Sequence, residues 1–170
     1  MVSPGPIADA DALNAFADRA TDLADRKSEA VLTPHAGEFA RLMGTTARQQ
    51  ASDRLSSVRA LAKITGAVAL LKGSRTLIAE PGGTVRINPT GSSVLATAGS
   101  GDVLTGVIGG LLARGVAPAE AAASAAYLHG LAGILAGSDK GEGTAAGDLI
   151  EKLPQALARV APSETSVRRR

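Results

Sequence analysis

Residues 67–71, the run Ala-Val-Ala-Leu-Leu, constrain the fold of this chain more than any other stretch. All five are apolar and no polar residue alternates with them, which is typical of a strand buried on both faces of a sheet. Such a strand needs helices above and below it. The run therefore predicts an α/β fold, and 170 residues suffice for one domain of this kind.

The amino-acid composition limits which residues can form the core and which partners the chain can bind. Hydrophobic residues make up 45% of the chain but aromatic residues only 2%, so the core must consist of Ala, Leu, Val and Ile. Of the formal charge of +2, three positive charges come from residues 168–170, and the rest is close to neutral. No pattern of basic and aromatic residues suggests nucleic acid as a partner.

Several other classes are also disfavoured. The absence of cysteine excludes disulfides and thiolate metal sites, and two histidines far apart in sequence argue against a histidine metal cage, so no metal ligand is assigned. No apolar run reaches the roughly 20 residues of a membrane span. We expect no membrane partner, a cytoplasmic location and a homo-oligomer.

Hydrophobic periodicity predicts the remaining elements. Helices are expected at residues 10–24, with Asp9 as N-cap, and at about 36–43, 48–64, 102–112, 121–135 and 145–160. Strands are expected at 30–33 and 76–79, and a third at 84–87 pairs with 76–79 as a hairpin around Pro81-Gly82-Gly83. We expect one domain over residues 1–160 and a disordered basic tail over 161–170.

The stretch Ala98-Gly99-Ser100-Gly101-Asp102 has the composition of an anion site. Backbone N–H groups at a helix N-terminus bind anions, and glycine lets a phosphate approach closely. An aspartate there can take a proton from a hydroxyl while the amides hold a phosphoryl group. Taken alone, however, this stretch favours the simpler interpretation of Asp102 as a helix cap over a catalytic aspartate. Helical spacing places it opposite the apolar stripe that begins at Val103 and Leu104.

Three loops follow predicted strands: residues 33–35, 72–75 and 88–102. Ligands of open α/β sheets bind at the carboxyl ends of strands, which would bring His35, Lys72 and Asp102 to one rim. Each residue also has a simpler interpretation. The simpler interpretation of His35 is a solvent-facing loop residue, and that of Lys72 is a residue that solvates a turn. That of Glu38 is a cap of the helix that begins near residue 36. His129 is interpreted as a packed or surface residue.

Taken together, the motifs are specific. In order they are Thr33-Pro34-His35-Ala36-Gly37-Glu38-Phe39, Leu71-Lys72-Gly73, Ile87-Asn88-Pro89-Thr90-Gly91, and residues 95–106, Leu-Ala-Thr-Ala-Gly-Ser-Gly-Asp-Val-Leu-Thr-Gly. This series resembles the ADP-dependent NAD(P)H-hydrate dehydratase family, carbohydrate-kinase-like nicotinamide repair enzymes of the ribokinase superfamily. Residues 9–14 (Asp-Ala-Asp-Ala-Leu-Asn) and 127–130 (Tyr-Leu-His-Gly) resemble it too, so the likeness covers residues 7–155.

The resemblance implies a partial ribokinase-like fold with a mostly parallel sheet, flanking helices and a small β-hairpin. It also implies a hydro-lyase of metabolite repair that uses ADP or ATP, with Mg²⁺, to dehydrate hydrated NADH or NADPH. The substrate hydroxyl is phosphorylated and then eliminated as phosphate. The implied roles are catalysis and substrate contact for Asp102, substrate binding for His35, nucleotide binding for Lys72, Gly73, Ser74, Arg75, Thr76 and Gly101, and an anion hole at Gly99, Ser100 and Gly101.

The sequence departs from the family at its start. Members carry further residues before the Asp-Ala-Asp-Ala-Leu-Asn segment, so we expect an N-terminally truncated domain with an exposed sheet edge and a substrate site lacking one wall. Two alternatives stay open. One is a small-molecule kinase of the superfamily acting on a vitamin precursor, and the other is an inactive nucleotide-binding remnant.

Overall fold

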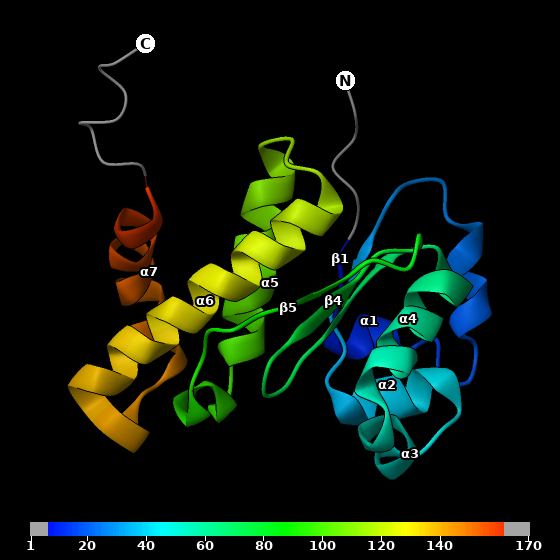
Figure 1. Ribbon diagram of the computed structural model, residues 1–170, viewed down its shortest axis with the longest axis horizontal. Coiled ribbons are helices and arrows are strands. Elements are labelled where there is room, and N and C mark those ends of the chain that lie inside the picture. Colours follow the sequence, from blue (N-terminus) through cyan, green and yellow to red (C-terminus); the bar gives the residue numbers. More distant parts are fainter. Residues whose placement is uncertain (1–6, 162–170) are drawn as a thin grey trace.

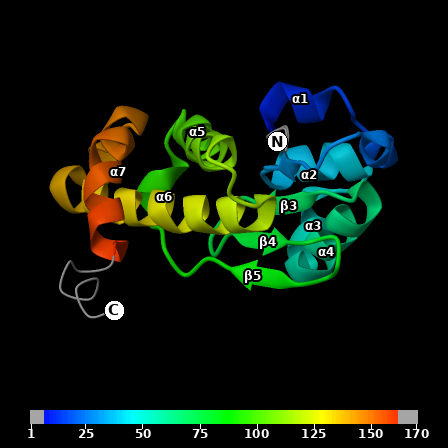
Figure 2. The ribbon, with the colours of Figure 1, turned by 90° about the horizontal axis from the view of Figure 1, so that it is seen from above.

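A computed structural model describes residues 7–161 and shows one five-stranded sheet with helices on both faces (Figures 1 and 2). The strands are β1 (Ile7–Ala8), β2 (Val31–Leu32), β3 (Val68–Leu71), β4 (Leu77–Ala79) and β5 (Val85–Ile87), and their order in the sheet follows their order in the chain. The predicted α/β class is confirmed. Strand β1 falls where the sequence predicted no strand.

The sheet is mixed. β1 runs parallel to β2 and β2 parallel to β3, whereas β4 is antiparallel to both of its neighbours. The antiparallel part is the predicted hairpin, in which Leu77 faces Ile87 and Ala79 faces Val85 across the ladder. Half of the strand pairs in the described chain are thus parallel, because the hairpin reverses direction directly after the buried strand β3.

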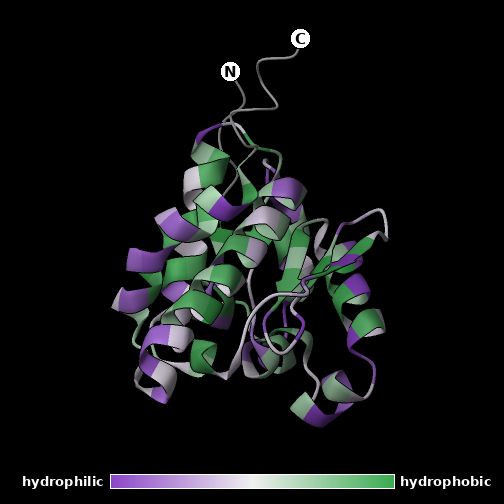
Figure 3. Cartoon of the chain, turned by 60° about the vertical axis from the view of Figure 1, so that its left-hand side comes forward, coloured by the Kyte–Doolittle hydropathy of each residue, from purple (hydrophilic) through white to green (hydrophobic). Residues whose placement is uncertain are grey.

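Alternate residues of the buried strand point to opposite faces, as strand geometry requires. Ala69 and Leu71 of β3 belong to one hydrophobic cluster, together with Leu61 of a covering helix. Val68 and Leu70 belong to a second cluster on the other face, with Leu104, Ile108 and several alanines. All four β3 residues are buried, so the uniformly apolar run reflects two cores. Figure 3 shows these hydrophobic strands between helices whose outer surfaces are more hydrophilic.

Two groups of helices cover the two faces (Figure 1). The first consists of α1 (Ala10–Asn14), the 3₁₀ helix η1 (Ala20–Asp25), α2 (Ala36–Met43), α3 (Ala47–Ser52) and α4 (Arg54–Thr65). The second consists of α5 (Ser100–Ala113), α6 (Pro118–Lys140) and α7 (Ala146–Val160), with short 3₁₀ turns η2 (Ser93–Ala96) and η3 (Gly141–Gly143) beside them. Small residues dominate the buried face of α6, which lets that helix approach both the sheet and α7 closely.

Two predicted helices are each broken in the structure. The helix expected over residues 10–24 ends after Asn14, and Asp18 takes a left-handed φ of 56°. The backbone N–H of Asp18 instead donates to the Arg41 carbonyl of α2 at 2.8 Å. The helix expected over residues 48–64 divides at Asp53, whose extended backbone lets its carboxylate accept from the Ser56 N–H and begin α4. In both places a polar contact outweighs helical spacing.

The predicted tail at residues 161–170 lies, apart from Ala161, outside the described residues. A single domain over residues 1–160 stays a prediction. Within residues 7–161, no helix has the length and apolar character needed to cross a membrane.

Candidate active site

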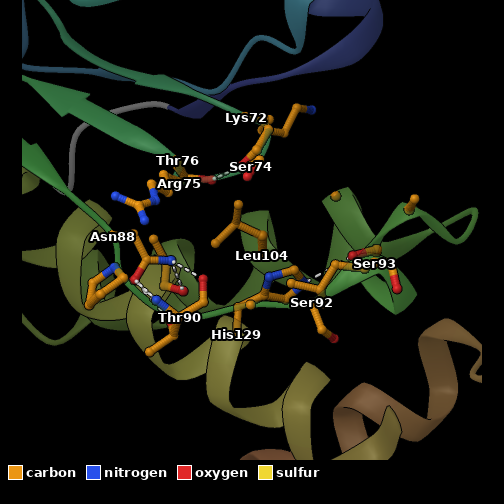
Figure 4. A pocket seen from close by; sticks show the side chains of 18 residues that line it. Lys72, Ser74, Arg75, Thr76, Asn88, Thr90, Ser92, Ser93, Leu104 and His129 are labelled. Atoms are coloured by element: carbon orange, nitrogen blue, oxygen red, sulfur yellow. Dashed lines mark hydrogen bonds between the residues drawn. The ribbon is translucent and has the colours of Figure 1, made fainter. Parts of the chain in front are cut away.

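A pocket of about 670 Å³ opens where the sheet meets the second helix group (Figure 4). Its walls come from the β3–β4 turn, the loop after β5, the start of α5 and the middle of α6. Among the lining residues are the cationic side chains Lys72 and Arg75 and no carboxylate. The Lys72 ammonium is paired with Asp9 and Glu38 outside the lining, so Arg75 is the cation that favours an anionic ligand. The lining residues are Lys72, Gly73, Ser74, Arg75, Thr76, Asn88, Pro89, Thr90, Gly91, Ser92, Ser93, Leu95, Ala96, Ser100, Gly101, Leu104, Ala126 and His129.

The β3–β4 turn, residues 72–76, forms one wall. Arg75 adopts a left-handed φ of 51°, an uncommon conformation for a residue with a side chain. The hydroxyl of Thr76 donates to the Gly73 carbonyl at 3.1 Å, and the guanidinium of Arg54, on α4, donates to the Ser74 carbonyl at 2.5 Å. Helix α4 therefore stabilises this turn through the hydrogen bond from Arg54.

The loop after β5 is fixed by its Asn-Pro-Thr-Gly segment. The Asn88 amide donates to the Ala126 carbonyl of α6 at 3.0 Å, and the Thr90 hydroxyl lies 3.0 Å from the Tyr127 carbonyl. The loop reaches α6 this closely only because α6 carries glycine opposite it. A Cβ at Gly130 would lie 2.1 Å from Thr90 Oγ1 and 2.8 Å from the Thr90 backbone carbon. The glycine is required by the close approach of the two segments.

Helix α5 begins at the pocket. Gly99 stands at its N-cap with a φ of 81°, which glycine adopts without strain. The Ser100 N–H donates to the Thr97 carbonyl at 3.3 Å, and the Val103 N–H to the Gly99 carbonyl at 3.2 Å. The N–H groups of Gly101 and Asp102 belong to the first turn, where a helix supplies no internal acceptor. Gly101 lines the pocket, whereas Asp102 is exposed on the same turn and lies outside the lining.

Ser100 is joined to α6 by a side-chain contact. Its hydroxyl oxygen lies 3.1 Å from Nε2 of His129, and both residues are buried (Figure 4). Burial lowers the pKa of His129 below its ordinary value, although a hydrogen bond with the Ser100 backbone acts in the opposite direction. The imidazole is therefore neutral at neutral pH. Of the two interpretations given to His129, packed or at the surface, the structure shows the packed one, and the contact with Ser100 was not predicted.

A chain of charged groups, which we call the charged chain, runs from the pocket edge to the Thr-Pro-His loop. The Lys72 ammonium lies 2.8 Å from Asp9 Oδ1 and 3.5 Å from Glu38 Oε2. The other oxygen of Glu38 lies 3.4 Å from His35 Nε2. The Glu38 side chain is only 6% exposed and that of His35 is 53% exposed, so the chain leads from the interior to the surface. In Figure 4 the Lys72 ammonium and the Arg75 guanidinium point in opposite directions.

Asp9 occupies the centre of this arrangement. Its second oxygen accepts from the Thr105 hydroxyl of α5 at 2.8 Å, so the residue links β1, β3 and α5. Burial works against ionisation of Asp9, but hydrogen bonds from Lys72 and Thr105 and the Lys72 charge outweigh it and lower the pKa of Asp9. Asp9 stands at the N-cap of α1, as predicted, but its carboxylate makes no capping hydrogen bond.

His35 is held by the start of α2. Its Nδ1 accepts from the backbone N–H groups of Gly37 and Glu38, while Glu38 accepts from the His35 N–H at 2.7 Å. This reciprocal capping box confirms the predicted capping role of Glu38. In the neutral ring the proton therefore lies on Nε2, the nitrogen that faces Glu38.

The structure brings some of the predicted site residues together and separates others. Residues 72–76, Ser100 and Gly101 line one pocket; His35 is connected to it through Glu38 and Lys72, and Gly99 and Asp102 adjoin it on the α5 turn. Sequence analysis gave no site role to Asp9, Asn88, Thr90, Thr105 or His129. The Asn-Pro-Thr-Gly motif was an available signal for two of them, whereas the other three depend on partners 29 to 96 residues away.

The α/β fold that carries this pocket is that of the ribokinase-like class of proteins. A solved ribokinase-like superfamily protein of Enterococcus faecalis shares the fold, with a TM-score of 0.70 and 28% identity over 91% of this chain and 52% of that chain. A crystal structure of the ADP/ATP-dependent NAD(P)H-hydrate dehydratase of Bacillus subtilis, co-crystallised with ATP/Mg²⁺, is more similar. Its TM-score is 0.80 and its identity 35%, over 92% of this chain and 56% of that one.

Sequence comparison identifies the family. Residues 2–155 match the carbohydrate-kinase family model described as NAD(P)H-hydrate dehydratase, and the chain belongs to that family. It is 53% identical over 152 residues to the bifunctional NAD(P)H-hydrate repair enzyme of Moorella thermoacetica, covering 89% of this chain and 29% of that enzyme. It is 47% identical over 146 residues to the ADP-dependent (S)-NAD(P)H-hydrate dehydratase of Neisseria meningitidis, covering 80% of this chain and 49% of the relative. The chain thus spans half or less of each curated relative.

Proposed function

We propose that this chain carries out ADP-dependent dehydration of hydrated NADH or NADPH. The observation that carries the proposal is the meeting of the 72–76 turn and the first turn of α5 in one cationic pocket, in a chain of this family. The first turn would hold the phosphoryl group that moves, and residues 72–76 the rest of the nucleotide. ATP is an alternative donor.

The proposed reaction has two steps. Asp102 takes the proton of the substrate hydroxyl, whose oxygen forms a bond to the terminal phosphorus of ADP while the bond from that phosphorus to AMP breaks. The carbon–oxygen bond then breaks and phosphate leaves with its electron pair, while the neighbouring ring carbon gives up a proton to the departing phosphate, so that the ring double bond of the dinucleotide is restored. His35 contacts the hydrate through Nε2. The amides of Gly99 and Gly101 support the phosphoryl group during transfer, whereas the Ser100 amide, predicted to join them, donates to the Thr97 carbonyl.

Mg²⁺ is expected to arrive with the nucleotide phosphates, as in many phosphoryl-transfer sites. Among residues 7–161, no group of three or more histidine or acidic side chains is placed to hold a metal ion. Asp9 and Glu38, the carboxylates nearest to Lys72, are already paired with its ammonium. The described residues do not form a metal site by themselves, and we assign no step to the ion.

The test is a turnover assay with hydrated NADH and ADP that follows the appearance of NADH. We expect Asp102→Asn to lower kcat at least about a hundredfold, the usual loss for a general base. Asp22→Asn is the matched control, because Asp22 pairs only with Arg19 at the surface, and its rate should equal that of the unmodified chain. ADP binding without NADH formation would favour the inactive-remnant alternative. Phosphate transfer to a vitamin precursor would favour the other alternative, a small-molecule kinase of the superfamily. A homo-oligomer and a cytoplasmic location stay predictions.

A further inference from the structure

His129 is an unusual residue for its position. Within α6, the whole of which the structure describes, it is the only buried residue with a polar side chain, and its buried neighbours are alanine, glycine and leucine. A buried imidazole costs free energy unless it is hydrogen-bonded, and an apolar residue would satisfy the packing without that cost. The contact with Ser100 is therefore the feature that needs an explanation.

Ser100, the partner of His129, is the first residue of α5, and its placement therefore affects the turn that we propose binds the phosphoryl group. The N-cap of α5 is Gly99, which has no side chain with which to cap the helix. In α2, α3 and α4 the cap residue itself fixes the first turn through its side chain, whereas α1, α6 and α7, like α5, begin without a side-chain cap. At α5 a hydrogen bond from outside the helix takes this place: Ser100, the first helical residue, is joined to α6 through His129.

The contact between Ser100 and His129 lies at the wall of the pocket. Ser100 and His129 both line the pocket, and Ser100 precedes Gly101, whose N–H belongs to the open first turn. Small displacements of groups that hold a reacting phosphoryl group are costly, because electrostatic stabilisation depends on donors already in place. A loosened Ser100 would therefore weaken the hold on the terminal phosphoryl group more than the hold on the rest of the nucleotide.

We propose that His129 is a positioning residue whose hydrogen bond to Ser100 fixes the first turn of α5 against the terminal phosphoryl group of the bound nucleotide. This inference rests on the proposed function for the identity of the ligand. It assigns His129 no contact with the reacting atoms. The effect of this hydrogen bond is measured by how much the terminal phosphoryl group strengthens binding. That quantity is the Kd for AMP divided by the Kd for ADP.

The experiment compares His129→Gln with His129→Asn. A glutamine amide reaches about as far along the side chain as imidazole Nε2, whereas an asparagine amide reaches only as far as Nδ1. The Gln variant should keep the AMP/ADP ratio of Kd values within about twofold of the unmodified chain. The Asn variant should lower that ratio about fivefold to tenfold, the equivalent of one lost hydrogen bond, with the Kd for AMP almost unchanged. Calorimetric titration gives both constants.

Ser100→Ala removes the same hydrogen bond from its other end and should lower the ratio as much as His129→Asn. In the double variant the two losses should not add. Thermal melts establish that each variant is folded, and Ser100→Ala decides the question should His129→Asn fail to fold. Equal ratios in the Gln and Asn variants, or an unchanged ratio in Ser100→Ala, would overturn the proposal.

The same data separate this inference from the proposed function. A ratio that responds to these substitutions in a chain that forms no NADH would refute the dehydratase activity and leave the role of His129 standing. A chain that dehydrates the substrate but whose AMP/ADP ratio of Kd values does not respond would support the dehydratase activity and refute the role of His129. If the unmodified chain binds neither AMP nor ADP, both proposals fail.

Discussion

The two sides of the pocket are held by different physical means. On the side of α6, Asn88, Thr90, Ser100 and His129 form uncharged hydrogen bonds, and we call these the neutral contacts. On the side of α2, the charged chain of Asp9, Lys72, Glu38 and His35 joins three separate segments. The neutral contacts depend on how closely the backbones approach, whereas the charged chain depends on ionisation. Substitutions that alter shape and substitutions that alter charge should therefore affect opposite sides of one site.

The largest effect is expected at Gly130. In Gly130→Ala the new Cβ would meet both the side chain and the backbone of Thr90, so the loop must move away from α6. We expect a loss of about 3 kcal/mol in the free energy of unfolding, the upper part of the usual range for overpacking. Urea denaturation measures it.

Gly110→Ala is the matched control for this substitution. Gly110 also lies within a helix, but a Cβ there meets nothing within 4 Å. It should stabilise the chain by about 0.5–1 kcal/mol, because alanine is the better helix former. Equal stabilities of the two alanine variants would show that the loop does not pack against α6 as described.

A smaller effect is expected from Asp9→Asn. The substitution removes the charge that pairs with Lys72 but retains an oxygen that can accept from Thr105. We expect a loss of about 1–2 kcal/mol in the free energy of unfolding at neutral pH, because a hydrogen bond to a charged group is lost in a partly buried place. The AMP/ADP ratio of Kd values should change less than in His129→Asn. A larger change would mean that the two sides of the pocket are not independent.

The pH dependence of this loss follows from the lowered pKa of Asp9. A carboxyl whose pKa is lower in the folded chain stabilises it fully above the unfolded value and loses that contribution as the pH falls through the folded value. The stability difference between the unmodified chain and Asp9→Asn should therefore be constant near neutral pH. It should shrink below the ordinary value of 3.8, towards the lowered pKa. A difference that persists unchanged in strong acid would show that Asp9 contributes by packing rather than by charge.

The smallest effect is expected from Thr105→Val, which keeps the side-chain shape and removes one hydrogen bond to Asp9. The Lys72 pair remains, so the loss should be about 0.5–1 kcal/mol. Because a hydrogen bond that lowers the pKa of Asp9 is removed, the acid-dependent loss of stability should be smaller in this variant and should be complete at a higher pH than in the unmodified chain. Thermal melts across the acid range provide the measurement, and an unshifted pH profile would contradict this account of the Asp9 environment.

Local patterns predicted those features that neighbouring residues decide. The apolar run before Lys72 became the doubly covered strand β3, the Pro-Gly-Gly turn became the hairpin, and Gly44 and Gly66 ended their helices with left-handed φ values. The breaks at Asp18 and Asp53 were not predicted, because each depends on a polar group meeting a backbone partner rather than on the spacing of apolar residues.

The same limit applies to the candidate site, where the residues that contact one another lie further apart in the sequence. Its glycines and its aspartate stand in one contiguous stretch, and so the first turn of α5, where we propose that the phosphoryl group binds, could be located from the sequence. The acid that pairs with Lys72 lies 63 residues before it, and its placement next to a helix start favoured the ordinary interpretation as a cap. Only the parallel pairing of β1, β2 and β3 brings Asp9 beside that lysine.

The order of the strands has a consequence for how the chain is made. Because each strand lies beside the one before it in sequence, all five described strands can pair once residue 87 has emerged from the ribosome. At that stage α2 and α4 can already cover one face, but Val68, Leu70 and Ile78 still await α5 and α6 on the other. A nascent chain at this length presents a bare apolar sheet face, and the helices that bury it are the same two that complete the pocket.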